Sequence, residues 1–181
     1  LNYCQQKCSN NVGLIMADAN HLPLQDDSVD IIFSNLVLQW CEPLDKAISE
    51  SLRILKPGGT FVFTTLLEGT LIELKESWAE VDNDKHVNDF LTEQCLQNVL
   101  NNANCSEFET QVRDIVLEYE NVVHLAHELK GLGANHVPKK KNKGLAGKEK
   151  WNKMCSAYEV FKDNSGIYPA TYKLCSIHIT K

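Results

Sequence analysis

Short apolar runs alternate with amphipathic stretches along the chain, and their order predicts a parallel sheet covered by helices. Residues 28–35 and 60–66 are rich in β-branched and aromatic side chains, as in buried strands. Between them, apolar residues recur at helical spacing from Leu44 to Leu55, after a proline suited to a helix start and before a Lys-Pro-Gly-Gly stop. A strand, a helix and a strand in this order predict a crossover between parallel strands.

The same reading extends to both ends of the chain. Val12 to Ala17 is predicted to form a buried strand, and Thr70 with Glu73 has the spacing of a capping box at a helix start. Two more strands are predicted at 111–118 and within 168–181, and helices at 1–9, 70–81, 92–103, 122–130 and 148–161. The sequence therefore predicts an α/β fold without internal repeats.

Composition limits the class of protein. The 181 residues are 43% hydrophobic, enough for one globular core, and no apolar run approaches the roughly 20 residues that cross a bilayer. The seven cysteines form no Cys-x-x-Cys pair, so free thiols in a reducing compartment are expected, as in a cytoplasmic protein. His124 and His127 lack further ligands nearby, and no metal site is predicted.

Charge is distributed unevenly. The net charge of −6 argues against nucleic acid as the main partner. However, the segment from Lys130 to Lys153 holds eight of the 18 basic residues and one acidic residue, which leaves 10 basic and 23 acidic residues elsewhere. This asymmetry suggests a docking surface for an acidic partner, although a solvated loop with incidental lysines would have the same composition.

Polar residues follow two of the predicted strands. In open parallel sheets, ligands bind beyond the carboxyl ends of the strands, so Asp18, Ala19 and Asn35 are expected at one edge. Asp18 could accept a hydrogen bond from an adenine amino group, or it could simply cap its own turn. Gln39 and Trp40 follow Asn35 by about one helical turn, and pattern alone leaves Trp40 either in the core or in a pocket.

Several ordered motifs carry a family resemblance. "ADANHLPLQDDSVDIIFSNLVLQW" and "LKPGGTFVFTT" resemble the class I S-adenosylmethionine-dependent methyltransferases. Together with "HVNDFL", "ELKGLGANHV", "GLAGKEKW" and "YPATYKL", they resemble the malonyl-acyl-carrier-protein O-methyltransferases of biotin biosynthesis. The resemblance implies a three-layer Rossmann-like sheet with a helical cap, and one methyltransferase domain over residues 1–181 in which the basic loop and helix 130–161 form a docking insertion.

The resemblance also implies a cofactor and its binding residues. S-adenosyl-L-methionine would be held at its adenine by Asp18 and Ala19, and Asn35 and Leu36 would border its methionyl end. A malonyl carboxylate is already ionised at pH 7, so methyl transfer to it needs no general base. Catalysis by alignment and exclusion of water is expected, without a catalytic acid or base.

Substrate residues are implied in the same way. Gln39 and Trp40 would face the malonyl group, and His86 and Asn88 are weaker candidates that a helix-start region would explain equally well. The partner would be malonyl-acyl-carrier protein, with no nucleic acid or membrane involved. Its acidic surface would contact the lysines of the basic segment, Lys139, Lys140, Lys141, Lys143, Lys148 and Lys150.

One large departure from the family leads to a further expectation. The family's sheet has the strand order 3-2-1-4-5-7-6. Its glycine-rich loop and its strands 1 and 2 do not occur before Val12, so on the order of 60 residues would be absent. We therefore expect the chain to be part of a longer protein, with unpaired strand edges when taken alone. A trans-aconitate-type carboxyl methyltransferase and a non-catalytic module that binds an acidic protein are the alternatives.

Overall fold

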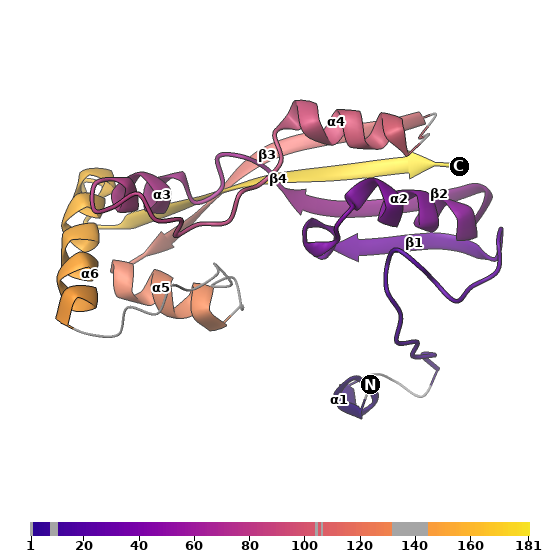
Figure 1. Ribbon diagram of the computed structural model, residues 1–181, viewed down its shortest axis with the longest axis horizontal. Helices are drawn as coiled ribbons and strands as arrows, with labels where there is room; N and C mark the ends of the chain where they lie inside the picture. The colour runs from indigo at the N-terminus through magenta and orange to yellow at the C-terminus, as the bar shows by residue number, and fades with distance from the viewer. Residues whose placement is uncertain (1, 8–10, 104, 106, 132–144) are drawn as a thin grey trace. The chain divides into compact units, whose positions relative to one another are not determined.

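The chain folds into a four-stranded sheet, with helices before and between its strands in the sequence (Figure 1). The computed structural model describes residues 2–7, 11–103, 105, 107–131 and 145–181. The strands are β1 (Val29–Asn35), β2 (Leu55–Leu66), β3 (Glu107–Tyr119) and β4 (Tyr168–Thr180). The helices are α1 (Asn2–Lys7), α2 (Leu44–Ile54), α3 (Ile72–Ala79), α4 (Glu93–Asn102), α5 (Val122–Gly131) and α6 (Leu145–Tyr158), with short 3-10 turns η1 (Leu38–Trp40) and η2 (Glu159–Phe161).

The sheet has the order β1-β2-β4-β3. β1 and β2 are parallel, and α2 lies between them in the chain, so the predicted crossover is confirmed. The order matches the last four positions of the expected family order, 4-5-7-6. The sequence pattern therefore predicted the parallel pairing of β1 with β2, and the family resemblance predicted the order of the four strands.

The predicted strand from Val12 to Ala17 is wrong. These residues have no strand conformation, and Ile15 and Met16 are 59% and 82% exposed. A strand needs a hydrogen-bonded neighbour, and none pairs with this stretch in the part of the chain that the structure describes. β1 is consequently an edge strand, as expected, with Ile31 and Phe33 each 70% exposed.

The Lys-Pro-Gly-Gly turn lies inside β2 rather than before it. β2 begins at Leu55, and its register against β1 shifts between Val29 and Ile31. A Cβ atom at Gly59 would lie 2.9 Å from the carbonyl oxygen of Asp30, so only glycine lets the two strands approach so closely. The turn signal in the sequence therefore marks a bulge in the sheet.

The predicted capping box at α3 is also wrong. Leu71 precedes the helix in the left-handed region, with φ of 54°, and no side chain caps the helix. The hydroxyl of Thr70 accepts the N–H of Lys173 at 3.1 Å, and the carboxylate of Glu73 accepts the N–H of Thr171 at 3.0 Å. Both predicted capping side chains bind β4, because the strand offers them buried partners that a local cap cannot.

Two compact units share the strands, and each has its own buried residues. The first comprises Leu1–Thr65, Leu96–Thr110 and Ser176–Lys181, and the second comprises Leu66–Cys95 and Gln111–Cys175. In the first unit, residues from α2, β2, α4 and β4 are fully buried, including Ile48, Phe61, Leu100 and Ile177. In the second, α3, α5, α6 and β4 contribute to one cluster: Leu71, Leu74, Val87, Tyr119, Val122, Leu125, Leu129, Met154, Tyr158, Tyr168 and Ala170.

Two composition-based expectations can be compared with the structure. All six cysteines in the described ranges, Cys4, Cys41, Cys95, Cys105, Cys155 and Cys175, are free thiols, as predicted. Among the helices described, none is both long enough and apolar enough to cross a membrane.

Candidate functional site

The carboxyl end of β1 places Asn35 and Leu36 at an exposed edge of the first unit. Asn35 is the last residue of β1, and Leu36 takes a left-handed conformation with φ of 53°. The N–H of Leu36 donates to both oxygens of Thr64, to the carbonyl at 3.2 Å and to the hydroxyl at 3.1 Å. The chain therefore turns sharply out of the sheet at a defined position, with both predicted cofactor residues accessible.

The turn η1 places Trp40 at the surface. Leu38 is 4% exposed and anchors the turn, whereas Trp40 is 54% exposed. The side-chain oxygen Oε1 of Gln39 is buried without a hydrogen-bond partner. Trp40 therefore does not lie in the core of this chain, and its place in a pocket stays a prediction. An unpaired buried acceptor such as Gln39 Oε1 is costly unless a ligand or water pairs with it.

The Asp18 loop lies beside the residues that follow η1. The Asp18 carboxylate accepts the Asn20 N–H at 2.9 Å, and the Asn20 side chain donates to the carbonyl oxygen of Glu42 at 3.3 Å. Burial, and secondarily the negative charge of Asp18, raises the pKa of the Cys41 thiol. The structure thus brings Asp18 close to the segment that carries Gln39 and Trp40.

One oxygen of the Asp18 carboxylate caps the turn that Asp18 itself begins. Asp18 Oδ1 receives the Asn20 N–H, and the Asp18 carbonyl receives the N–H of His21 at 2.9 Å. Because an ionised carboxylate accepts about four hydrogen bonds, this capping role leaves acceptor capacity. Ala19 is half-buried in the same turn. Both readings of Asp18 are therefore compatible with its geometry.

In the second unit, His86 belongs to a polar and aromatic cluster. Its ring stacks on Trp78 with centroids 3.7 Å apart and an angle of 8° between planes, and its Nε2 lies 2.7 Å from Asp82 Oδ1. Lys150 on α6 donates to Asp82 Oδ2 at 2.6 Å. Hydrogen bonds from Lys150, and then from His86, lower the pKa of Asp82 to about 2. Asn88, the other predicted residue of this segment, is half-buried.

The same cluster has ligands of the kind that bind metals. The side chains of Asp82, Asp84 and His86 bring ligand atoms within 4.8 Å of one another. The Lys150 ammonium lies 2.6 Å from Asp82 and 3.9 Å from Asp84, so a cation already neutralises these carboxylates. This arrangement is typical of an ion-pair network that ties a loop to a helix.

The basic segment is only partly described. Lys139, Lys140, Lys141 and Lys143 lie outside the described residues. Lys148 is exposed on α6, and Lys153 pairs with Glu149 at 3.0 Å. The ammonium of Lys150 is engaged by Asp82. The docking role of all six predicted lysines stays a prediction, and Lys148 is the described lysine whose geometry fits it best.

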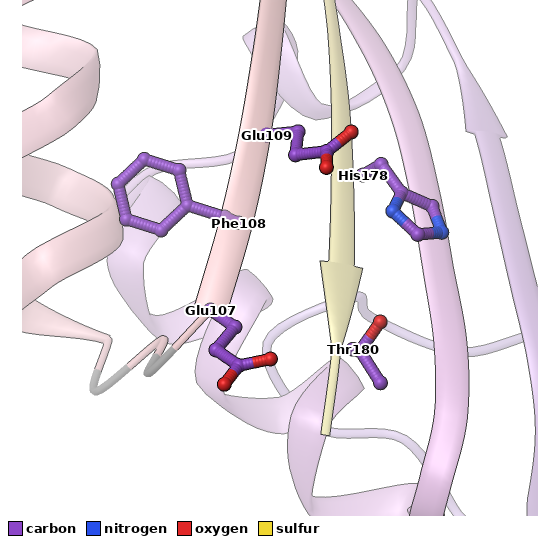
Figure 2. A pocket seen from close by; sticks show the side chains of 5 residues that line it. All are labelled: Glu107, Phe108, Glu109, His178 and Thr180. Atoms are coloured by element: carbon purple, nitrogen blue, oxygen red, sulfur yellow. The ribbon is translucent and has the colours of Figure 1, made fainter.

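A surface hollow of about 380 Å³ lies elsewhere in the first unit. It is lined by Glu107, Phe108, Glu109, His178 and Thr180. Figure 2 shows Phe108 pointing to the opposite side of β3 from Glu109. None of the predicted site residues lines this hollow. The hollow and the predicted site therefore lie at different places on this chain.

Sequence reasoning missed Thr64 and Asn20. Thr64 bonds to Asn35 and Leu36, and Asn20 joins the Asp18 loop to Glu42, with its Oδ1 buried and unpaired. Pairing the two predicted strands in register would have pointed to Thr64, which lies opposite Asn35. No pattern in the sequence marks Asn20, because its partner is 22 residues away.

Residues 1–63 match the family model described as a methyltransferase domain. The chain is 38% identical over 162 residues to the malonyl-[acyl-carrier protein] O-methyltransferase of Yersinia pestis, covering 88% of this chain and 58% of that protein. It is 35% identical over 173 residues to the protein of the same name from Methylococcus capsulatus, covering 96% of this chain and 63% of that protein. The chain thus spans about 60% of the length of these relatives.

A solved structure resembles the fold. The YcgJ protein of Bacillus subtilis aligns over 99% of this chain and 75% of its own, with a TM-score of 0.62 and 20% identity. An identity this low shows the fold alone. The predicted class I methyltransferase fold is confirmed by this likeness, by the methyltransferase domain match and by the observed strand order.

Proposed function

We propose that this chain, a homologue of the malonyl-[acyl-carrier protein] O-methyltransferases, acts in the methylation of the free carboxylate of malonyl-acyl-carrier protein, the step that begins pimeloyl synthesis for biotin. The observation that carries the proposal is the identity of 38% over 162 residues to a relative of that name. The carboxyl end of β1 and the turn η1 support the proposal, because they bring together residues that could contact both reactants: Asn35, Leu36, Gln39 and Trp40.

The residues present fit S-adenosylmethionine as methyl donor. Asn20 Oδ1 and Gln39 Oε1 are buried acceptors without partners, and the Asp18 carboxylate retains acceptor capacity. The cofactor carries amino and hydroxyl donors that such acceptors can bind. When bound, it supplies a methyl group on a sulfonium. Asp18 and Ala19 would hold its adenine, and Asn35 and Leu36 its methionyl end.

The reaction requires little acid–base chemistry from the chain. The carboxylate oxygen would take the methyl group while the sulfur keeps the electron pair of the broken carbon–sulfur bond, so the chain would not have to move a proton. Because a cation and an anion become neutral, exclusion of water favours the transfer. Trp40 would provide an apolar wall against the bound reactants, and Gln39 and Trp40 would orient the carboxylate.

We also propose that the basic segment docks the acidic carrier protein. Lys148 would contact it together with the lysines at 139–141 and 143. Opposite surface charges would mainly increase the association rate and align the carrier. His86 and Asn88, in the second unit, stay weaker candidates for binding the malonyl group.

Methyl transfer from labelled S-adenosylmethionine tests the proposal in the full chain. We expect transfer to malonyl-acyl-carrier protein to exceed transfer to free trans-aconitate. Preference for the free acid would overturn the proposed substrate and favour the trans-aconitate type. A full chain that neither transfers a methyl group nor gains thermal stability with S-adenosylhomocysteine would instead be a binding module, since a ligand of the native state raises its stability.

A further inference from the structure

Helix α2 carries a polar stripe whose members share one face. Lys46, Glu50 and Arg53 are spaced i, i+4 and i+7, so they lie along one side of the helix. The opposite side is buried and contains Ala47, Ile48, Ser51 and Ile54. Such a stripe is usually a solvated surface. Here, however, the stripe faces the loop between Asp18 and Asp26.

Arg53 holds this loop through main-chain oxygens. Its Nη1 donates to the carbonyl of Leu24 at 2.9 Å, and its Nη2 donates to the carbonyl of Leu22 at 3.0 Å. Nη1 also bonds to the carboxylate of Asp26. A guanidinium fixes groups in a rigid planar fork, which a lysine ammonium cannot reproduce.

Glu50 completes the attachment. It accepts Arg53 Nε at 2.9 Å and Nη2 at 2.8 Å, and its Oε1 also accepts the N–H of Leu22 at 2.8 Å. With these bonds, all five N–H groups of Arg53 have acceptors. The bond from Arg53, and then that from Leu22, lowers the pKa of Glu50 to about 2.

The third member of the stripe reaches the turn that contains Asp18. Lys46 Nζ lies 2.9 Å from Nε2 of His21. His21 in turn donates its main-chain N–H to the Asp18 carbonyl at 2.9 Å. The loop is therefore attached to three successive turns of α2, and Asp18 lies one short hydrogen-bonded turn from the first attachment.

We infer that Arg53, together with Glu50, is a positioning residue that holds the 18–26 loop so that Asp18 and Ala19 can bind the adenine end of the cofactor. This inference rests on the proposed function and deepens it. Arg53 acts through the main chain of Leu22 and Leu24. Arg53 lies in the last turn of α2, and only its contacts with the loop give it this role.

The test compares Arg53→Lys with Arg113→Lys in the full chain. Arg113 is exposed on β3 and is the other arginine of the sequence, so it receives the same chemical change outside the loop. We expect Arg53→Lys to weaken the Kd for S-adenosylhomocysteine about tenfold, as measured by calorimetry well below the melting temperature, because the loop loses two or three hydrogen bonds. Arg113→Lys should leave the Kd unchanged.

A double-mutant cycle separates positioning from general stability. If Arg53 acts through Asp18, Asp18→Ala and Arg53→Lys together should weaken binding by less than the product of their separate effects. A lower melting temperature with unchanged Kd, or independent multiplicative effects, would overturn the inference. Should Arg53→Lys fail to fold, Glu50→Gln loses the charge but keeps an acceptor for Leu22, and we expect a severalfold loss of affinity; an unchanged Kd would overturn the inference.

The wild-type protein separates this inference from the proposed function. If the wild type does not bind S-adenosylhomocysteine, the proposed function fails. If the wild type binds it and Arg53→Lys binds it equally well, only the positioning role of Arg53 fails.

Discussion

The hydroxyl of Thr64 donates to Oδ1 of Asn35 at 2.6 Å, across the parallel pair of β1 and β2. The hydroxyl oxygen of Thr64 also accepts the N–H of Leu36 at 3.1 Å. One hydroxyl therefore fixes both the side chain of Asn35 and the backbone turn that follows it. Asn35 and Leu36 are the two residues proposed to border the methionyl end of the cofactor.

Replacing Thr64 by valine tests this relationship. Thr64→Val keeps the shape of the side chain but removes both hydrogen bonds, so we expect a severalfold weaker Kd for S-adenosylhomocysteine and a loss of about 1–2 kcal/mol in the free energy of unfolding. Calorimetry and denaturant titration measure the two effects. Thr60→Val on the same strand is the control and should leave the Kd unchanged. An equal Kd for both variants would contradict the role of Thr64.

Truncation of Trp40 should separate binding from stability. Because the side chain is 54% exposed, Trp40→Ala should change the free energy of unfolding by no more than about 0.5 kcal/mol. We expect the KM for malonyl-acyl-carrier protein to rise at least severalfold, with partial recovery in Trp40→Phe. Steady-state kinetics and thermal melting check this. A large drop in melting temperature with an unchanged KM would assign Trp40 to packing instead.

Asp82 should make the stability of the protein sensitive to acid. Hydrogen bonds from Lys150 and His86 hold its pKa at about 2, below the ordinary value of 3.8. A lowered pKa in the folded state means that the stabilisation is present above about pH 4 and is lost as the pH falls toward 2. Asp82→Asn should therefore cost about 1–2 kcal/mol at pH 7, and this difference from the wild type should shrink toward pH 2.

Denaturant titrations from pH 7 down to the acid limit of folding measure this difference. Asp84→Asn is a suitable control, because Asp84 is exposed and its carboxylate, 3.9 Å from the Lys150 ammonium, is too far away for a hydrogen bond. A stability difference for Asp82→Asn that stays constant between pH 5 and the lowest accessible pH would contradict the assignment.

Two lysines of α6 should respond differently to substitution. Lys150→Gln removes the partner of Asp82 and should lower the melting temperature. Lys148→Glu should leave the melting temperature unchanged and raise the KM for malonyl-acyl-carrier protein, more at low than at high salt. Charge reversal of Lys139 to Lys141 should act as Lys148→Glu does. If the KM stays constant in both charge-reversal variants, the basic segment is a solvated loop and not a docking surface.

Apart from the wrongly predicted strand at Val12 to Ala17, the sequence by itself determined the order of strands and helices and the parallel crossover through α2. These features depend on local periodicity and on steric rules of connection, which act over a few tens of residues. The motifs that follow the strands also identified the methyltransferase fold and directed attention to Asn35 and Trp40. Both lie at the exposed carboxyl end of β1, as expected.

Only the tertiary structure decided which partner each polar side chain takes. Thr70 and Glu73 have the spacing of a capping box but bind β4, and Lys150 pairs with Asp82 from 68 residues away. Arg53 holds a loop that lies 27 to 31 residues earlier in the chain. Such partners are chosen by burial and geometry after the chain has folded, because a buried polar group gains most from the best-placed partner and not from the nearest one in sequence.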